Sequence, residues 1–193
     1  MDISDYRCNI VALLAAASVA AATAAAFAAG HDDPESFSHY VAKDGAITRP
    51  ADYREKFEHI GTSAVATKPG GPVDEMHSVY SRPEDVKAFR RDGKFPDGAV
   101  LVKEVTKVAS EKLTAGEAHW SADPKLWFVL VKDAKGRFPG NDLWGDGWGW
   151  GLFLANNPAK NVATDYKVDC RTCHIPAKQD DWLYVRVYPG LKK

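Results

Sequence analysis

Hydrophobic and polar residues alternate along the middle of the chain with the two-residue period that is typical of a β-strand. In residues 99–108 this alternation predicts two faces, with Leu101, Lys103, Val105 and Lys107 on one and Val100, Val102 and Glu104 on the other. Apolar runs predict further strands at residues 126–132, 148–155 and 182–188, and a fifth at residues 75–80. Because no helix separates successive pairs of these strands, the pattern indicates an antiparallel sheet.

Two short helices are predicted beside these strands. The first follows Pro50, where apolar residues and a terminating glycine have helical spacing: Tyr53, Phe57, Ile60 and Gly61. The second is predicted to begin at Ser81, because residues 81–84 have the form of a capping box, with Val86 and Phe89 inside the helix. The expected fold class is therefore α+β and β-rich, a single domain built on an antiparallel sheet with a few short helices.

The first 30 residues have the pattern of a targeting segment. Residues 10–29 are almost all Ala, Val, Leu and Ile, and small residues precede His31 as they do at a secretory cleavage site. We expect a signal peptide over residues 1–30 and export to the periplasm. An uncleaved membrane anchor is the alternative, because the apolar run approaches spanning length. Residues 31–49 are expected to form an irregular N-terminal arm that precedes the domain at residues 50–193.

The charge balance argues against two classes of partner. The full chain carries a net charge of −1. The targeting segment has the same net charge, from Asp2, Asp5 and Arg7, so the remaining domain is formally neutral. Nucleic acids and anionic membranes both require a cationic surface. We therefore expect no nucleic acid as a partner, and no anionic membrane surface.

Two of the three cysteines lie in the pentapeptide CRTCH at residues 170–174. C-x-x-C-H is the attachment signature of a c-type haem, in which two thiols bond to the vinyl groups and the histidine ligates the iron. The third thiol, Cys8, lies in the targeting segment. A thioredoxin-like pair requires a βαβ context, and a zinc site requires further ligands at finger spacing. The motif thus predicts one covalent haem c on Cys170 and Cys173, with His174 as the proximal iron ligand.

The order of other blocks around this motif resembles the cytochrome P-460 family, which includes the β-sheet form of cytochrome c′. The resemblance spans roughly residues 50–190 and implies that the domain at residues 50–193 is a cytochrome P-460-like haem domain. The matching blocks are residues 53–54, 57, 61–62, 76–80, 95–104, 127–129, 132–133, 148–153, 161–164, 170–174, 176–177 and 181–182.

The resemblance implies a largely antiparallel β fold and a haem iron with an open distal position. In some members a lysine nitrogen is bonded to the haem ring, and those members oxidise hydroxylamine. Members without this bond bind nitric oxide and related small ligands under an apolar cap. Lys103 is the candidate for the bond, because it lies in the block where the family's lysine is expected. The alternatives are a solvated Lys103, or Lys107 as the bonded residue.

Asp165 is the candidate catalytic base. Active family members have a carboxylate over the distal haem at about this separation from the ligating histidine, and Asp165 precedes His174 by nine residues. Such a carboxylate can take protons from hydroxylamine as the iron takes electrons. An aspartate that faces water is the alternative. Glu104 is a lesser candidate, because neighbouring strand residues point in opposite directions and it therefore points away from Lys103.

Met76 and His77 are the residues that would change the type of cytochrome. Either one, as a sixth iron ligand, would close the distal side and produce an electron carrier. An ordinary strand or surface histidine is the simpler interpretation of His77.

The haem motif, together with what the resemblance implies, predicts a haem oxidoreductase that acts on hydroxylamine or nitric oxide and passes electrons to a soluble electron-transfer partner. The alternatives are a non-enzymatic cytochrome that binds nitric oxide for scavenging or sensing, and a simple electron carrier. The sequence is also compatible with a homodimer.

Overall fold

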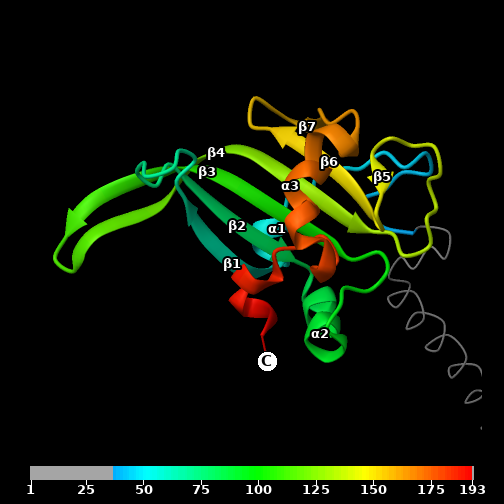
Figure 1. Cartoon of the computed structure of the whole chain (residues 1–193), viewed down its shortest axis with the longest axis horizontal. Coiled ribbons are helices and arrows are strands. Elements are labelled where there is room, and N and C mark those ends of the chain that lie inside the picture. The colour runs from blue at the N-terminus through cyan, green and yellow to red at the C-terminus, as the bar shows by residue number, and fades with distance from the viewer. Residues whose placement is uncertain (1–36, 193) are drawn as a thin grey trace, which may run out of the picture. The chain divides into compact units, whose positions relative to one another are not determined.

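The chain forms one antiparallel β-sheet with helical segments on both of its faces. The computed structural model describes residues 37–192, and the predicted signal peptide at residues 1–30 lies outside them. Seven strands pair in the order β1-β2-β3-β4-β6-β5, with β7 paired to β6 (Figure 1). Their bounds are β1 (Glu58–Val65), β2 (Glu75–Ser81), β3 (Val100–Leu113), β4 (Gly116–Lys132), β5 (Trp144–Gly145), β6 (Trp148–Leu154) and β7 (Asn157–Asn161). The predicted α+β, β-rich fold is confirmed.

The helices are short. α1 (Tyr53–Lys56) precedes β1, α2 (Pro83–Asp92) connects β2 to β3, and α3 (Thr172–His174) lies in a longer helical segment near the C-terminus. That segment begins with a π-helical turn, η1 (Lys167–Arg171), and continues after α3 as three 3-10 turns: η2 (Ile175–Asp180), η3 (Val185–Val187) and η4 (Pro189–Leu191). None of the helices within residues 37–192 is long and apolar enough to cross a membrane.

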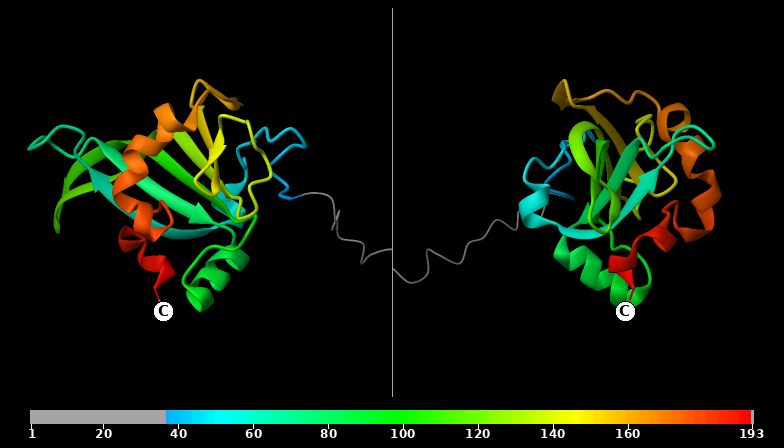
Figure 2. Two further views of the ribbon diagram at one scale, coloured as in Figure 1. Left: turned by 45° about the vertical axis from the view of Figure 1, so that its right-hand side comes forward. Right: turned by 90° about the vertical axis from the view of Figure 1, so that its left-hand side faces the viewer.

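The alternation predicted for β3 divides the core between the two faces of the sheet. Leu101 packs in a cluster with α2 and the C-terminal segment, whereas Val100 and Val102 pack in a second cluster with α1 and the N-terminal residues 37–49. Figure 2 shows these two layers on opposite sides of the strands. Val100 and Val102 are fully buried, and each such side chain contributes about 1.5–3 kcal/mol to folding. The face that carries Leu101 is the one that packs against the CRTCH motif.

Four predicted strands are confirmed as β2, β3, β4 and β6. β3 and β4 are longer than expected, because they continue as a hairpin in which Leu113 pairs with Gly116. The hairpin projects beyond the rest of the sheet (Figure 1), and most of its residues are exposed or half-buried on both faces. It therefore lacks the apolar alternation by which the other strands were predicted.

The helix predicted from Pro50 to Gly61 is wrong beyond its first turn. α1 ends at Lys56, Phe57 is extended, and Ile60 lies in β1. Helical spacing over so few residues stabilises a helix only weakly. Pairing of β1 with β2 instead satisfies the backbone and buries Ile60 to 1% exposure.

The strand predicted at residues 182–188 is also wrong. Asp181 and Trp182 have φ angles of 57° and 66°, a left-handed conformation that cannot enter a strand. The amides that follow donate to nearby carbonyls, including Val187 N–H to Tyr184 O at 3.0 Å. The apolar residues of this segment are buried by packing against the sheet and not by pairing within it.

The second helix is confirmed, but its predicted cap is wrong. α2 begins at Pro83, with Arg82 as the N-cap residue and no side-chain cap. The Ser81 hydroxyl donates to the carbonyl oxygen of Val100 at 2.8 Å, so it is used to join β2 to β3. The helix ends at Gly93, whose φ of 73° suits a glycine after a helix C-terminus.

Candidate functional site

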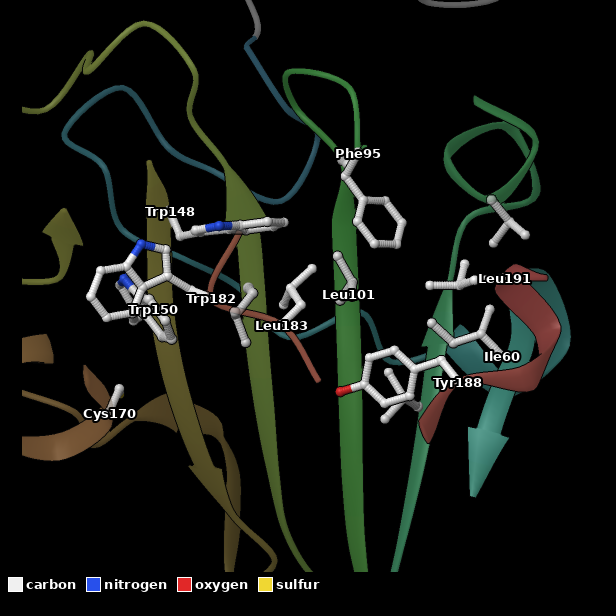
Figure 3. Packing of buried hydrophobic residues seen from close by; sticks show 14 of the residues in the cluster. Ile60, Phe95, Leu101, Trp148, Trp150, Cys170, Trp182, Leu183, Tyr188 and Leu191 are labelled. Carbon is white, nitrogen blue, oxygen red and sulfur yellow. The ribbon is translucent and has the colours of Figure 1, made fainter. Parts of the chain in front are cut away.

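The CRTCH motif lies in the C-terminal helical segment, with Cys170 in η1 and both Cys173 and His174 in α3. Residues three and four apart on a helix share one face, so the two cysteines and the histidine lie together. Figure 3 shows Cys170 on this segment, on the same side of the sheet as Trp150 and Leu101. Both thiols are free. Burial, followed by the nearby Asp169, raises the pKa of Cys170 to about 12, so its thiol stays protonated.

His174 is oriented by a backbone carbonyl. Its Nδ1 lies 2.6 Å from the carbonyl oxygen of Trp182. A carbonyl only accepts hydrogen bonds, so Nδ1 carries the hydrogen and Nε2 keeps its lone pair. Burial lowers the pKa of His174, which favours this neutral form. A histidine held at one nitrogen with the other nitrogen free has the arrangement of a metal ligand.

The position of the Trp182 carbonyl depends on β4 and β6. Lys132, at the end of β4, donates to both carboxylate oxygens of Asp181 at 2.7 Å. Trp148, at the start of β6, donates from Nε1 to the carbonyl oxygen of Asp181 at 3.0 Å. These contacts hold the left-handed conformations of Asp181 and Trp182, which are unfavourable for residues other than glycine. The sheet thereby fixes the partner of His174.

A cavity of about 440 Å³ lies between the sheet and the C-terminal segment, next to Cys173 and His174. This volume is within the range of ligand and cofactor pockets. A smaller space of about 100 Å³ reaches Cys170 and Trp150 and is also lined by Cys173 and His174. The walls of the larger cavity are mainly apolar and include Val79, Leu101, Phe128, Leu130, Leu183 and Val187.

Lys103 lines both spaces. Its ammonium group lies 4.4 Å from the centre of the Phe128 ring, and within residues 37–192 it has no hydrogen bond or ion pair. Burial lowers the pKa of Lys103, and the charges of Cys173 and Glu75 oppose the shift. Lys107, in contrast, is exposed and pairs with Asp123 at 3.5 Å. Of the two candidate lysines, the structure thus brings Lys103 to the cysteines and the histidine.

The two predicted carboxylates lie elsewhere. Asp165 is half-buried ahead of η1, where its Oδ1 accepts from the Lys167 amide at 2.8 Å, and it lines neither space. Glu104 lies on the opposite face of the sheet, 2% exposed, and accepts from Arg54. The structure therefore does not bring either carboxylate to Lys103 and His174.

β1 and β2 contribute two polar residues to the cavity, of which sequence reasoning missed Ser63 and named His77 only as an alternative iron ligand. Ser63 and His77 both line the larger cavity, and the pairing of Val79 with Lys103 puts them on the same face of the sheet. The strand register shows that the face with His77 also carries Lys103. Met76, the neighbouring candidate ligand, does not line the cavity.

These residues fit a haem of the c type. Two free thiols and an imidazole with an available Nε2 lie on one helical face, against an apolar cavity of suitable size. The donor set of two sulfurs and one imidazole nitrogen suits thioether attachment and iron ligation.

The comparisons with known proteins agree with this arrangement. The family model for cytochrome P460 matches residues 50–185. No curated protein sequence matches the chain significantly. The family implies a haem-iron cofactor and a cytochrome function. Since the matched region covers most of the chain and contains the CRTCH motif and all the cavity-lining residues except Val187 and Tyr188, the chain belongs to the cytochrome P460 family.

Proposed function

We propose that this protein is an exported cytochrome that oxidises hydroxylamine, or reacts with nitric oxide, at a single covalently bound haem. The observation that carries the proposal is the cavity of about 440 Å³ that Lys103 and His174 line together. Cys170 and Cys173 would bond to the haem through thioethers, and Nε2 of His174 would ligate its iron. When bound, the haem supplies an electron acceptor and a metal that binds small nitrogen ligands.

Lys103 is proposed to bond to the haem ring. A nucleophilic nitrogen must be neutral, and the lowered pKa of Lys103 increases the neutral fraction. Such a bond would replace one hydrogen on the lysine nitrogen and one on a ring carbon, and an oxidant such as hydrogen peroxide would have to accept the two electrons. The absence of an ion pair within residues 37–192 leaves the Lys103 nitrogen free for this reaction.

The proposal also includes export, a redox partner and a catalytic base. Export to the periplasm through residues 1–30 brings the cysteines to the compartment where c-type haem is attached. Electrons then leave singly to a soluble redox partner, and a homodimer is compatible with this activity. Asp165 stays a proposed base for hydroxylamine outside the cavity, where its Oδ1 accepts from the Lys167 amide.

The proposal is tested on protein produced with the c-type haem maturation system. The ferric spectrum and the rate of hydroxylamine oxidation with a chemical electron acceptor are measured first. Proteolysis and mass spectrometry should then find haem joined to a peptide with residues 170–174 and to a second peptide with Lys103, two hydrogens lighter than the sum.

Lys107→Leu is the matched control, because Lys107 is on the same strand but exposed. It should keep the second bond and the turnover, whereas Lys103→Leu should lose both. Protein that stays colourless after denaturation would refute haem attachment. A haem attached only through cysteine, without hydroxylamine turnover, would refute the enzyme.

A nitric oxide-binding cytochrome is the second candidate, and the apolar walls of the cavity favour it. Leu101, Phe128 and Leu130 offer no hydrogen bonds to a polar substrate, but they suit a small, weakly polar gas. An ordinary high-spin spectrum, nitric oxide binding and no hydroxylamine turnover would identify this function.

A further inference from the structure

His77 lies on β2 and lines the larger cavity. It pairs with Ser63 of β1 and Val105 of β3, and it lines the cavity together with Lys103 and His174. Its side chain is 24% exposed, so it is partly shielded from solvent yet open to the cavity. A simple strand histidine on the outer surface would not share a pocket with a proposed iron ligand.

One nitrogen of His77 is held by a carboxylate. Nε2 lies 2.8 Å from Oε2 of Glu75, and the other Glu75 oxygen accepts from Lys125. Burial raises the pKa of Glu75, but the hydrogen bonds from Lys125 and His77 outweigh burial and lower it. The Glu75 carboxylate is therefore ionised and can only accept hydrogen bonds. Nε2 of His77 must therefore carry the hydrogen. In the neutral ring Nδ1 then has a lone pair, which has no hydrogen-bond partner within residues 37–192.

We propose that His77 is the proton-accepting residue of this cavity and that Glu75 and Lys125 hold it and set its proton affinity. The inference rests on the proposed haem function and names the group that removes protons from the ligand. Oxidation of hydroxylamine releases protons together with electrons. Nδ1 of His77 takes a proton from an N–H or O–H bond, the bonding electrons stay on the ligand, and electrons leave to the redox partner. The imidazolium then returns its proton to water.

The surroundings of His77 favour a base that is neutral at pH 7. Burial lowers the pKa of His77, the bond to Glu75 opposes this, and the charge of Lys125 lowers the pKa further, as does the charge of Lys103 before its proposed bond to the haem forms. The other titratable groups of the same cavity are Cys173, His174, Tyr184 and Tyr188. A general base works best with a pKa near the working pH, and such a group contributes about 10²–10⁴-fold to a rate.

Cyanide association with the ferric protein tests the assignment without relying on turnover. Hydrogen cyanide gives up its proton when its anion binds to iron, so a base in the cavity accelerates association. His77→Gln keeps a hydrogen bond to Glu75 but cannot titrate. We expect it to slow association about 100-fold at pH 7 and to remove the inflection from the pH profile.

His119→Gln is the matched control, because His119 is exposed on the projecting hairpin and, among the described residues, forms a hydrogen bond only with Ser110. It should leave the rate and the profile unchanged. Equal rates and profiles in the wild type and His77→Gln over pH 5–9 would overturn the inference.

Two further variants separate chemistry from a structural role. Glu75 raises the pKa of His77 and Lys125 lowers it. Glu75→Gln should therefore move the inflection to lower pH, and Lys125→Gln should move it to higher pH. Shifts in the same direction, or no shifts, would contradict the proposed roles of Glu75 and Lys125. Loss of packing alone would not move the inflection in opposite directions in the two variants.

The outcomes also separate this inference from the proposed function. If the wild type does not oxidise hydroxylamine but its cyanide association still depends on His77, the proposed function fails and the base assignment holds. A low-spin ferric spectrum that becomes high-spin in His77→Gln would instead identify His77 as an iron ligand. That result would overturn its role as a base.

Discussion

Lys103 and Glu104 are neighbours on β3, yet they lie on opposite faces of the sheet and in contrasting environments. On the face that packs against α1 and residues 37–49, Glu104 is 2% exposed and its carboxylate accepts from the guanidinium of Arg54. On the face that packs against the C-terminal segment, Lys103 lies beside a cavity, and within residues 37–192 the ring of Phe128 is the one interaction partner of its ammonium group.

The charge of Glu104 stabilises the fold through its pair with Arg54, whereas the charged nitrogen of Lys103 is available for chemistry. A buried charge with a hydrogen-bonded partner is compensated. A partly buried charge without a partner has a shifted pKa, and such groups are concentrated at functional sites. Lys132 sharpens the comparison, because it shares the sheet face of Lys103 but is paired with Asp181 at 2.7 Å.

The largest effect is expected from removing the partner of Glu104. Arg54→Met removes the cationic partner of a carboxylate with 3% side-chain exposure and leaves it with the hydroxyl of Tyr53. Loss of one partner from a buried pair costs about 3–5 kcal/mol, and we expect about 3 because Arg54 itself is solvated. Denaturation with urea measures the change in the free energy of unfolding. Lys56→Met, which removes the exposed pair with Asp52, should change it by less than about 0.5 kcal/mol.

A loss below about 1 kcal/mol in Arg54→Met would mean that Glu104 is neutral or hydrated in the folded protein. The contrast between the two faces would then disappear.

A smaller effect is expected for the paired lysine on the cavity face. Lys132→Met removes the contacts that hold Asp181 in its left-handed conformation. We expect a loss of about 1–2 kcal/mol in stability. The haem spectrum should also change, because the Trp182 carbonyl that orients His174 becomes less fixed. Lys135→Met, at an exposed position of the following turn, should change neither property.

The strands that the sequence predicted well are those with one buried face. β3, β4 and β6 have apolar alternation or runs, which report burial directly. The wrong predictions concern segments whose secondary structure is determined by long-range contacts. Ile60 has helical spacing from Phe57, but pairing of β1 with β2 outweighs it. Residues 182–188 have strand-like composition, and nothing in that composition shows that Trp182 adopts a φ of 66°.

The site was predictable where a residue type determines its chemistry. Cys170, Cys173 and His174 follow from a motif, and alternation separated Lys103 from Glu104 correctly. The carbonyl of Trp182 was not predictable, because every residue has one. His77 was passed over because its importance depends on the register of β2 against β3 and on the C-terminal segment that covers them.

Replacing Lys103 should increase the free energy of unfolding, whereas Arg54→Met and Lys132→Met should decrease it. In the haem-free protein, Lys103→Met removes a partly buried charge without leaving a partner behind, and we expect a gain of about 1 kcal/mol. Lys107→Met is the control and should change stability by less than about 0.5 kcal/mol, because Lys107 is solvated. A loss in Lys103→Met equal to that in Lys132→Met would show that Lys103 has a stabilising partner after all.

The pH dependence of this gain is the smallest effect and the most specific one. The folded pKa of Lys103 is lowered by burial, whereas in the unfolded chain a lysine has a pKa of about 10.4. Between these two values the unfolded state binds more protons than the folded state. The destabilisation that charged Lys103 causes in the wild type therefore decreases as pH rises. The advantage of Lys103→Met should thus be complete below the lowered pKa and vanish near pH 10.4.

Tyrosine ionisation does not disturb this test. The raised pKa of Tyr188, about 12 because of burial, lowers stability above pH 10 in both proteins alike, so it cancels in the difference. Urea denaturation of the pair at several pH values measures that difference. An advantage that stays constant up to pH 10.4 would mean that it arises from the better packing of methionine against Phe128, and not from the charge on Lys103.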